Sequence, residues 1–128
     1  MLDYDAYHTA VKGEVNDVFY YYREQAAVQA KQFQRALDDL AKAIELNPKE
    51  LTYFSELAVV NIRVGRNEEA IKVLKDALEI DPKYGEAYRL IGVAQLQLKQ
   101  NKEACASFAK AKELGDPNVD ALIEKHCK

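Results

Sequence analysis

Three stretches of the sequence share one pattern: RALDDLAKAIELNPKE at residues 35–50, EAIKVLKDALEIDPKY at 69–84 and EACASFAKAKELGDPN at 103–118. Each begins 34 residues after the previous one. Alanine occupies the second position in all three, as Ala36, Ala70 and Ala104, and it recurs seven residues later. Because several independent positions share one period, the chain is predicted to be built from structural repeats.

Each stretch has the spacing of an amphipathic helix. Small residues at i and i+7 and a large apolar residue at i+4 lie on one face, where a neighbouring helix can approach closely. A proline, which cannot continue a helix, follows each stretch, at Pro48, Pro82 and Pro117. A second apolar-periodic segment precedes each stretch after a short polar turn, at residues 20–30, 54–64 and 88–98. The repeat unit is therefore predicted to be a pair of helices, and the fold class all-α.

Helix pairs of this kind bury their apolar faces only by stacking on one another, and about three are needed for stability. We expect one domain with three helix pairs at 16–49, 50–83 and 84–117, an N-terminal helix within 1–15 and a C-terminal capping helix within 118–128. Asp116 or Asn118 can cap the last helix. The first helix is expected to end at Gly13 and to be the remnant of an earlier unit.

The composition limits the class of protein. The chain has 128 residues and a net charge of -3, which suits one modest domain and argues against binding to nucleic acid. No apolar run is long enough to span a membrane, so no membrane insertion is expected. The first ten residues, MLDYDAYHTA, lack the features of a secretory signal, which favours the cytoplasm if the chain is complete.

No catalytic, metal or cofactor motif stands out. The two histidines, His8 and His126, lie at opposite ends of the chain, and neither belongs to a motif. Cys105 is expected to be a small buried structural residue, and Cys127 an exposed one, because two cysteines do not indicate a disulfide framework. The sequence therefore predicts no enzyme, no cofactor and no metal site.

The helix pairs resemble the tetratricopeptide repeat, a 34-residue unit with the pattern W-x2-L-G-x2-Y, A-x3-F and P. The third unit matches best, with Tyr88, Ile91, Gly92, Ala104, Phe108 and Pro117. The second matches at Phe54, Leu57, Ala58, Ala70, Leu74 and Pro82, and the first at Tyr20, Ala36, Leu40 and Pro48. The first unit departs from the pattern at Arg23, Glu24 and Ala27, and a carboxylate at position 24 implies a looser fit or a local partner. The resemblance implies a right-handed α-α superhelix, and the chain resembles the C-terminal part of a bacterial repeat protein.

The resemblance also assigns faces to the four aromatic residues at 19–22. Tyr20 takes the large core position, and Phe19 needs a cover, for which residues 2–12 or a protein contact are candidates. In this family the first helix of each pair lines a concave groove. The positions that would line or flank it are Val18, Tyr21, Tyr22, Gln25, Ser55, Glu56, Val59, Arg63, Arg89, Val93 and Gln97. Tyr21 and Tyr22 are interpreted as groove residues, with filling of the gap beside the N-terminal helix as the alternative.

These residues indicate the kind of partner. One branch of the family clamps a C-terminal carboxylate with lysine and asparagine, which are absent from the corresponding positions here. Arg89 would instead be the charged anchor for a peptide with an apolar stretch and an acidic residue. We expect a protein-interaction module that binds a partner peptide. The alternative is a structural spacer or self-association segment, with a homodimer formed through the N-terminal edge.

Overall fold

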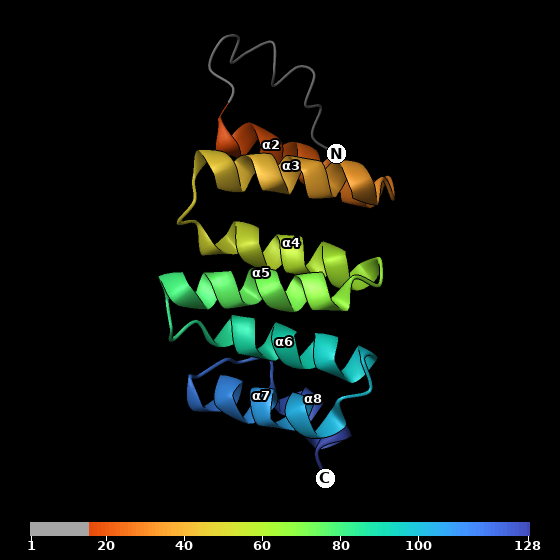
Figure 1. The fold of residues 1–128 in the computed structure, drawn as a ribbon, viewed down its shortest axis with the longest axis vertical. Coiled ribbons are helices and arrows are strands. Elements are labelled where there is room, and N and C mark those ends of the chain that lie inside the picture. Colours follow the sequence, from red (N-terminus) through yellow and green to blue (C-terminus); the bar gives the residue numbers. More distant parts are fainter. Residues whose placement is uncertain (1–15) are drawn as a thin grey trace.

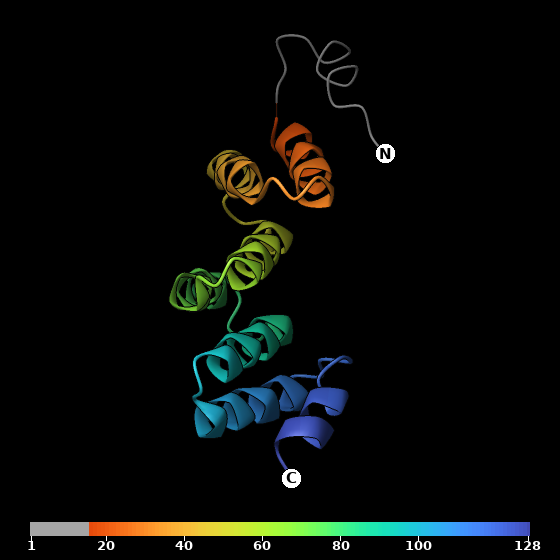
Figure 2. The same cartoon turned by 90° about the vertical axis from the view of Figure 1, so that its right-hand side faces the viewer.

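The computed structural model describes residues 16–128, and within this range the chain forms seven helices and no strand (Figure 1). The helices are α2 (Asp17–Gln29), α3 (Phe33–Leu46), α4 (Leu51–Arg63), α5 (Asn67–Ile80), α6 (Gly85–Gln97), α7 (Asn101–Glu113) and α8 (Asp120–His126). The first helices α2, α4 and α6 lie on one side of the stack and α3 and α5 on the other (Figure 2). The all-α helical-repeat superhelix expected from the sequence is thus confirmed. The helix expected within 1–15 lies outside the described residues.

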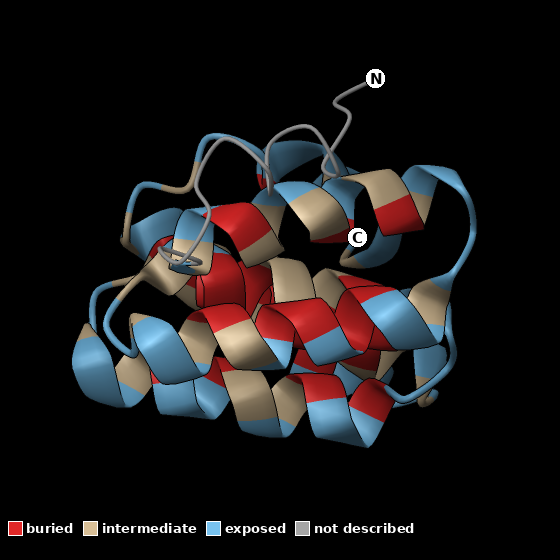
Figure 3. Ribbon diagram, turned by 90° about the horizontal axis from the view of Figure 1, so that it is seen from above, coloured by how far each residue is buried: buried red, intermediate tan, exposed pale blue. Residues whose placement is uncertain are grey.

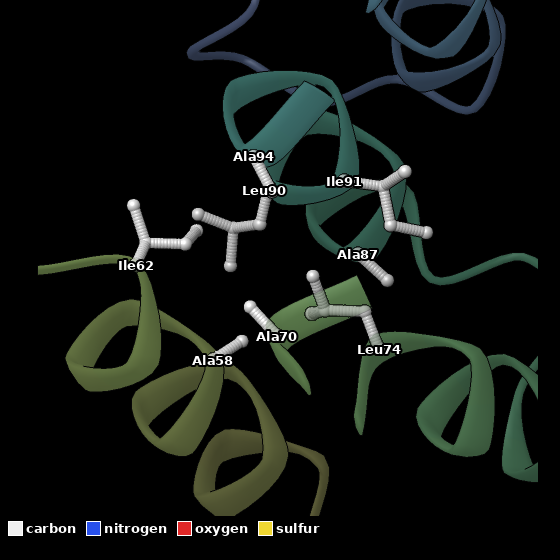
Figure 4. Close-up of a cluster of buried hydrophobic side chains, with 8 residues drawn as sticks. All are labelled: Ala58, Ile62, Ala70, Leu74, Ala87, Leu90, Ile91 and Ala94. Atoms are coloured by element: carbon white, nitrogen blue, oxygen red, sulfur yellow. The ribbon is translucent and has the colours of Figure 1, made fainter. Parts of the chain in front are cut away.

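The repeated alanines lie where the helices are closest. Ala36, Ala70 and Ala104 are all 0% exposed. The large residue four positions on is also 0% exposed in each unit, and so is the alanine at the seventh position: Leu40, Leu74 and Phe108, with Ala43, Ala77 and Ala111. Figure 4 shows the middle cluster, in which side chains of α4, α5 and α6 meet. Buried positions face neighbouring helices and exposed positions face outward (Figure 3).

The spacing between the helices leaves no room for a larger side chain at these alanines. Replacing Ala70 with leucine is expected to lower the free energy of unfolding by about 1 to 3 kcal/mol, because the added atoms force the α4–α5–α6 contact apart. Urea unfolding measures the loss. Replacing the exposed Lys72 of the same helix with leucine is the control. A loss for Ala70→Leu no larger than that of the control would contradict the packing.

The turn inside each pair has one geometry. Lys31, Gly65 and Lys99 have φ of 59°, 83° and 66°, in the left-handed region that usually follows the end of a helix. The next N–H donates to a carbonyl five residues back in all three turns, as from Arg66 to Asn61 at 2.8 Å. Two of the three turns use lysine where glycine is the easier residue, so this repeated turn was not evident from glycine spacing.

The C-terminal helix α8 packs on α7. Val119, Leu122 and Ile123 join the Phe108 cluster. Val119 is the N-cap residue and makes no side-chain cap, so the expectation that Asp116 or Asn118 caps this helix was wrong. The Asp116 carboxylate is engaged elsewhere, as shown below. None of the helices of residues 16–128 is long and apolar enough to cross a membrane.

Cys105 and Cys127 form a disulfide that ties the end of α8 to α7, with their Cα atoms 5.7 Å apart. Both residues are partly exposed. The expectation of a small buried Cys105 and a separate exposed Cys127 was therefore wrong. The cysteines are 22 positions apart, and only the fold of α8 back onto α7 brings them together.

Candidate functional site

Aromatic residues of α2 and α4 form one pocket at the N-terminal end of the stack. The Tyr21 ring lies 5.3 Å from the Tyr53 ring and 5.9 Å from the Tyr22 ring, measured between centroids. The pocket has a volume of about 330 Å³ and is lined by Val18, Tyr21, Tyr22, Glu50, Thr52 and Tyr53. Three of the groove residues expected from the sequence, Val18, Tyr21 and Tyr22, are thus brought together.

A hydrogen-bond network fixes one wall of this pocket. The Tyr53 hydroxyl donates to Asp17 Oδ2 at 2.5 Å, and Asn47 Nδ2 donates to the same oxygen at 3.3 Å. The Tyr53 hydrogen bond is the main reason why the pKa of Asp17 is lowered. Burial, and then the bond to Asp17, raises the pKa of Tyr53. The wall is therefore held in one position, which favours binding because little freedom is lost.

Glu24 lies behind this surface, one turn along α2 from Tyr21. It is 1% exposed, and its Oε2 has no hydrogen-bond partner among the described residues. Burial, with the neighbouring carboxyl groups of Glu56 and Asp39, raises the pKa of Glu24 from 4.5 to about 8. A buried carboxyl group without a partner is costly, and the sequence had flagged this position as a departure from the repeat pattern.

Further carboxyl groups continue along the first helices. Glu56 of α4 is half-buried, and burial followed by the charge of Glu86 raises its pKa. Burial and then the charges of Glu56 and Glu24 also raise the pKa of Tyr21. The charge of Glu86 on α6 thus affects the pKa of Glu56 on α4, and the charge of Glu56 affects the pKa values of Glu24 and Tyr21 on α2.

Arg89 of α6 is occupied by groups of this chain. Its Nε lies 3.1 Å from Asp116 Oδ2, and its Nη2 lies 3.2 Å from Glu86 Oε1. The Arg89 side chain is 17% exposed, and that of Asp116 is 2% exposed. Arg89 therefore joins α6 to the loop before α8, and its charge is already balanced by two carboxylates. The sequence analysis expected Arg89 to be the charged anchor for a peptide; in the fold it pairs with Asp116 and Glu86 of the chain itself.

Ser55 is also engaged within the fold. It is 6% exposed, and its Oγ lies 2.5 Å from the Tyr84 hydroxyl. The Tyr84 hydroxyl donates a hydrogen bond to Glu86 Oε2 at 2.5 Å, so Ser55 is the donor in its hydrogen bond with Tyr84. Burial, and then the bond to Glu86, raises the pKa of Tyr84 to about 12. Ser55 thus supports the surface and is not part of its outer layer.

The remaining candidates divide into two kinds. Val59 and Val93 are half-buried and pack against the central core cluster. Gln25, Arg63 and Gln97 are exposed, and the Arg63 guanidinium lies 5.2 Å from the centre of the Phe33 ring. Sequence reasoning missed Glu50, Thr52 and Tyr53 as pocket residues. Tyr53 follows Phe19 by 34 positions and is only 5% exposed, so the sequence pattern marks it as a packing residue although it also lines the pocket.

Nothing in the described part of the chain groups three or more potential metal ligands. Cys105 and Cys127 are consumed by their disulfide, so neither is a thiolate there. Beside the rings and carboxyl groups of this surface, the first helices expose the amides of Gln25 and Gln97 and the guanidinium of Arg63.

Comparison with known proteins agrees with this architecture. A family model described as TPR repeat matches residues 62–99, and one described as Tetratricopeptide repeat matches residues 85–114. The TPR domain of Arabidopsis OM64 is 28% identical, with a TM-score of 0.76, over 85% of this chain and 91% of that one. A mutant of MamA is 30% identical, with a TM-score of 0.68, over 78% of this chain and 73% of that one.

A third solved structure is similar in fold alone. The first TPR of Spaghetti (RPAP3), bound to an HSP90 peptide of sequence SRMEEVD, has a TM-score of 0.78 at 18% identity, over 88% of this chain and 90% of that one. No curated protein matches the chain.

Proposed function

We propose that this chain, which belongs to the tetratricopeptide repeat family, binds a segment of a partner protein along its first helices and catalyses no reaction. The observation that carries this proposal is the pocket of Val18, Tyr21, Tyr22 and Tyr53, in which aromatic rings from two helices surround an open volume. Tyrosine is enriched at binding surfaces because it combines large contact area with a hydroxyl group and few rotatable bonds.

The binding mode differs from that of a carboxylate clamp. The Spaghetti domain holds an HSP90 peptide that ends in an aspartate. In this chain, Tyr21, Gln25, Ser55 and Val59 stand at the corresponding positions of α2 and α4, and none is cationic. Arg89 is balanced by Asp116 and Glu86. We therefore propose an internal segment with an aromatic or aliphatic side chain in the pocket, and no recognition of a free C-terminus.

Replacing Tyr21 with alanine is expected to weaken partner binding by about 2 kcal/mol, or roughly 30-fold, because truncating a central aromatic residue removes most of its contact area. The fold should lose only about 1 kcal/mol, since Tyr21 is half-buried and belongs to no core cluster. Affinity capture of partners by the wild type and the variant, with their melting temperatures, measures both effects.

The exposed Lys72→Ala variant on α5 is the control for this experiment. A partner retained by the wild type and by Lys72→Ala but lost from Tyr21→Ala supports the proposal. Capture of the same proteins by all three excludes the pocket as the site. If only further copies of the chain are captured, self-association replaces partner binding as the function.

A further inference from the structure

We propose that the partner segment is basic, and that one of its lysine or arginine side chains binds at the carboxyl group of Glu56, while a neighbouring apolar side chain fills the Tyr21 pocket. This inference rests on the proposed function and specifies the chemistry of the partner. It reverses the charge that the sequence alone suggested for the ligand, because Arg89 is not available to an incoming acid.

The first observation is that Glu24 lacks a partner. It is 1% exposed, and no described residue donates to its Oε2. Proteins rarely leave a buried carboxyl oxygen without a hydrogen bond, so an isolated group of this kind calls for a structural or functional explanation. The charged groups that add to the effect of burial, Glu56 of α4 and Asp39 of α3, are acidic as well and increase the cost of its ionised form.

The second observation is the accessible carboxyl group beside it. Glu56 is half-buried and makes no hydrogen bond or ion pair with any described residue. Its pKa is raised by burial and by Glu86, and nothing nearby lowers it. Glu50 adds another carboxyl group at the pocket edge. A cation placed at Glu56 would therefore interact favourably with several acidic groups at once.

The arginines near this surface belong to other contacts. The guanidinium of Arg23 donates to both carboxylate oxygens of Asp39, at 2.7 to 3.1 Å. Arg89 is bound to Asp116 and Glu86, and Arg63 lies over the Phe33 ring. Each of these cations has a defined position, so none can neutralise Glu24 and Glu56 without breaking a contact that the fold already makes.

The pocket supplies the second half of the recognition. Tyr21 and Tyr53 line it, and on the same helices Glu24 and Glu56 follow them by three residues, so the acidic groups lie about one helical turn from the pocket rings. A ligand with a basic residue next to an aromatic or aliphatic one satisfies both. An acidic segment would meet Glu50, Glu56 and Glu86 and would be repelled.

Selection from a random octapeptide display library on the immobilised, folded chain tests the partner chemistry. We expect the selected peptides to combine lysine or arginine with a neighbouring apolar residue. A synthetic copy of the best one should bind the Glu24→Gln/Glu56→Gln variant at least tenfold more weakly than the wild type, and its affinity should fall as salt is added. Loss of binding through unfolding is not expected, because glutamine has nearly the shape of glutamate and the variant removes a buried carboxyl group that lacks a hydrogen-bond partner.

A matched variant separates local from general charge effects. Glu68→Gln/Glu69→Gln makes the same two glutamate-to-glutamine changes at exposed positions of α5 and should change the affinity less than twofold. Selected peptides that are neutral or acidic, or that bind both double variants alike, overturn the inference. If such peptides still require Tyr21, the proposed function stands and only the inference of a basic partner fails. If no peptide depends on Tyr21, the proposed function fails and the inference fails with it.

Discussion

The variant Phe108→Ala is expected to lose about 3 to 5 kcal/mol of unfolding free energy, the range for deleting a buried aromatic ring. Phe108 is 0% exposed and is the largest fully buried side chain of the cluster that joins α6, α7 and α8. Without the ring, Ala104, Ala111 and Val119 would line a cavity that the short α8 cannot close. Chemical denaturation followed by circular dichroism measures the loss.

The same ring explains the glycine of α6. A Cβ added at Gly92 would lie 2.6 Å from Cδ1 of Phe108 and closer still to Cε1. Gly92→Ala should therefore destabilise the chain although alanine is the better helix former. Phe108→Leu replaces the ring with a smaller side chain and should relieve this overlap. The double variant Gly92→Ala/Phe108→Leu should therefore lose less unfolding free energy than the sum of the two single losses. If the losses of Gly92→Ala and Phe108→Leu simply add in the double variant, the side chains at positions 92 and 108 do not compete for the same space.

Glu24→Gln is expected to raise the free energy of unfolding at pH 7 by an amount on the order of 3 kcal/mol, because it removes the cost of either ionising or protonating a buried carboxyl group. The group is 1% exposed and its pKa in the folded chain is about 8, against 4.5 for an ordinary glutamate. The amide has nearly the same shape, so the packing between α2, α3 and α4 should be preserved.

The effect should depend on pH in a defined direction. The folded state holds the Glu24 proton more tightly than the unfolded state, so the stability that this group contributes is complete below about pH 4.5 and is lost as the pH rises through about 8. The difference between Glu24→Gln and the wild type should accordingly be small at pH 4.5 and reach its maximum above pH 8. Urea unfolding at these values, with exposed Glu68→Gln as control, measures it.

A constant difference between the two proteins across this range would mean that Glu24 titrates normally. The pKa of Glu56 is raised as well, so its contribution to stability also falls as the pH rises. This contribution is the same in the wild type and in Glu24→Gln and does not affect their difference. The lowered pKa of Asp17 acts only in more acidic solution, below its ordinary 3.8. The comparison of the two curves therefore isolates Glu24.

The fold was predictable because the same few side chains recur at one spacing. Ala36, Ala70 and Ala104 are interchangeable in the structure as they are in the sequence, since each occupies the closest approach between helices. The prolines and the apolar period gave the helix ends to within a few residues. These features are local or strictly periodic, and no knowledge of distant contacts is needed to read them.

The candidate site was predictable only in part, because its properties depend on single contacts between distant residues. The aromatic residues at 19–22 pointed to the pocket, but whether Arg89 is available depends on Asp116, which is 27 positions away. The burial of Glu24 shows the same limit. The repeat pattern marked it as unusual, but only the arrangement of Asp39 and Glu56 around it makes it an unpaired acid.

The disulfide between Cys105 and Cys127 restrains the separation of α8 from α7 at the C-terminal end of the stack. Stability in a repeat array passes from each unit to the next, so terminal helices fray first. With the covalent link intact, α8 can separate from α7 only as far as one closed loop permits. In a reducing compartment the link becomes two thiols, and the helix is then held by the packing of Val119, Leu122 and Ile123 and by the exposed ion pair between Lys112 and Asp120. The exposure of the C-terminal face would then follow the thiol chemistry of the surroundings, independently of the binding surface on α2 and α4.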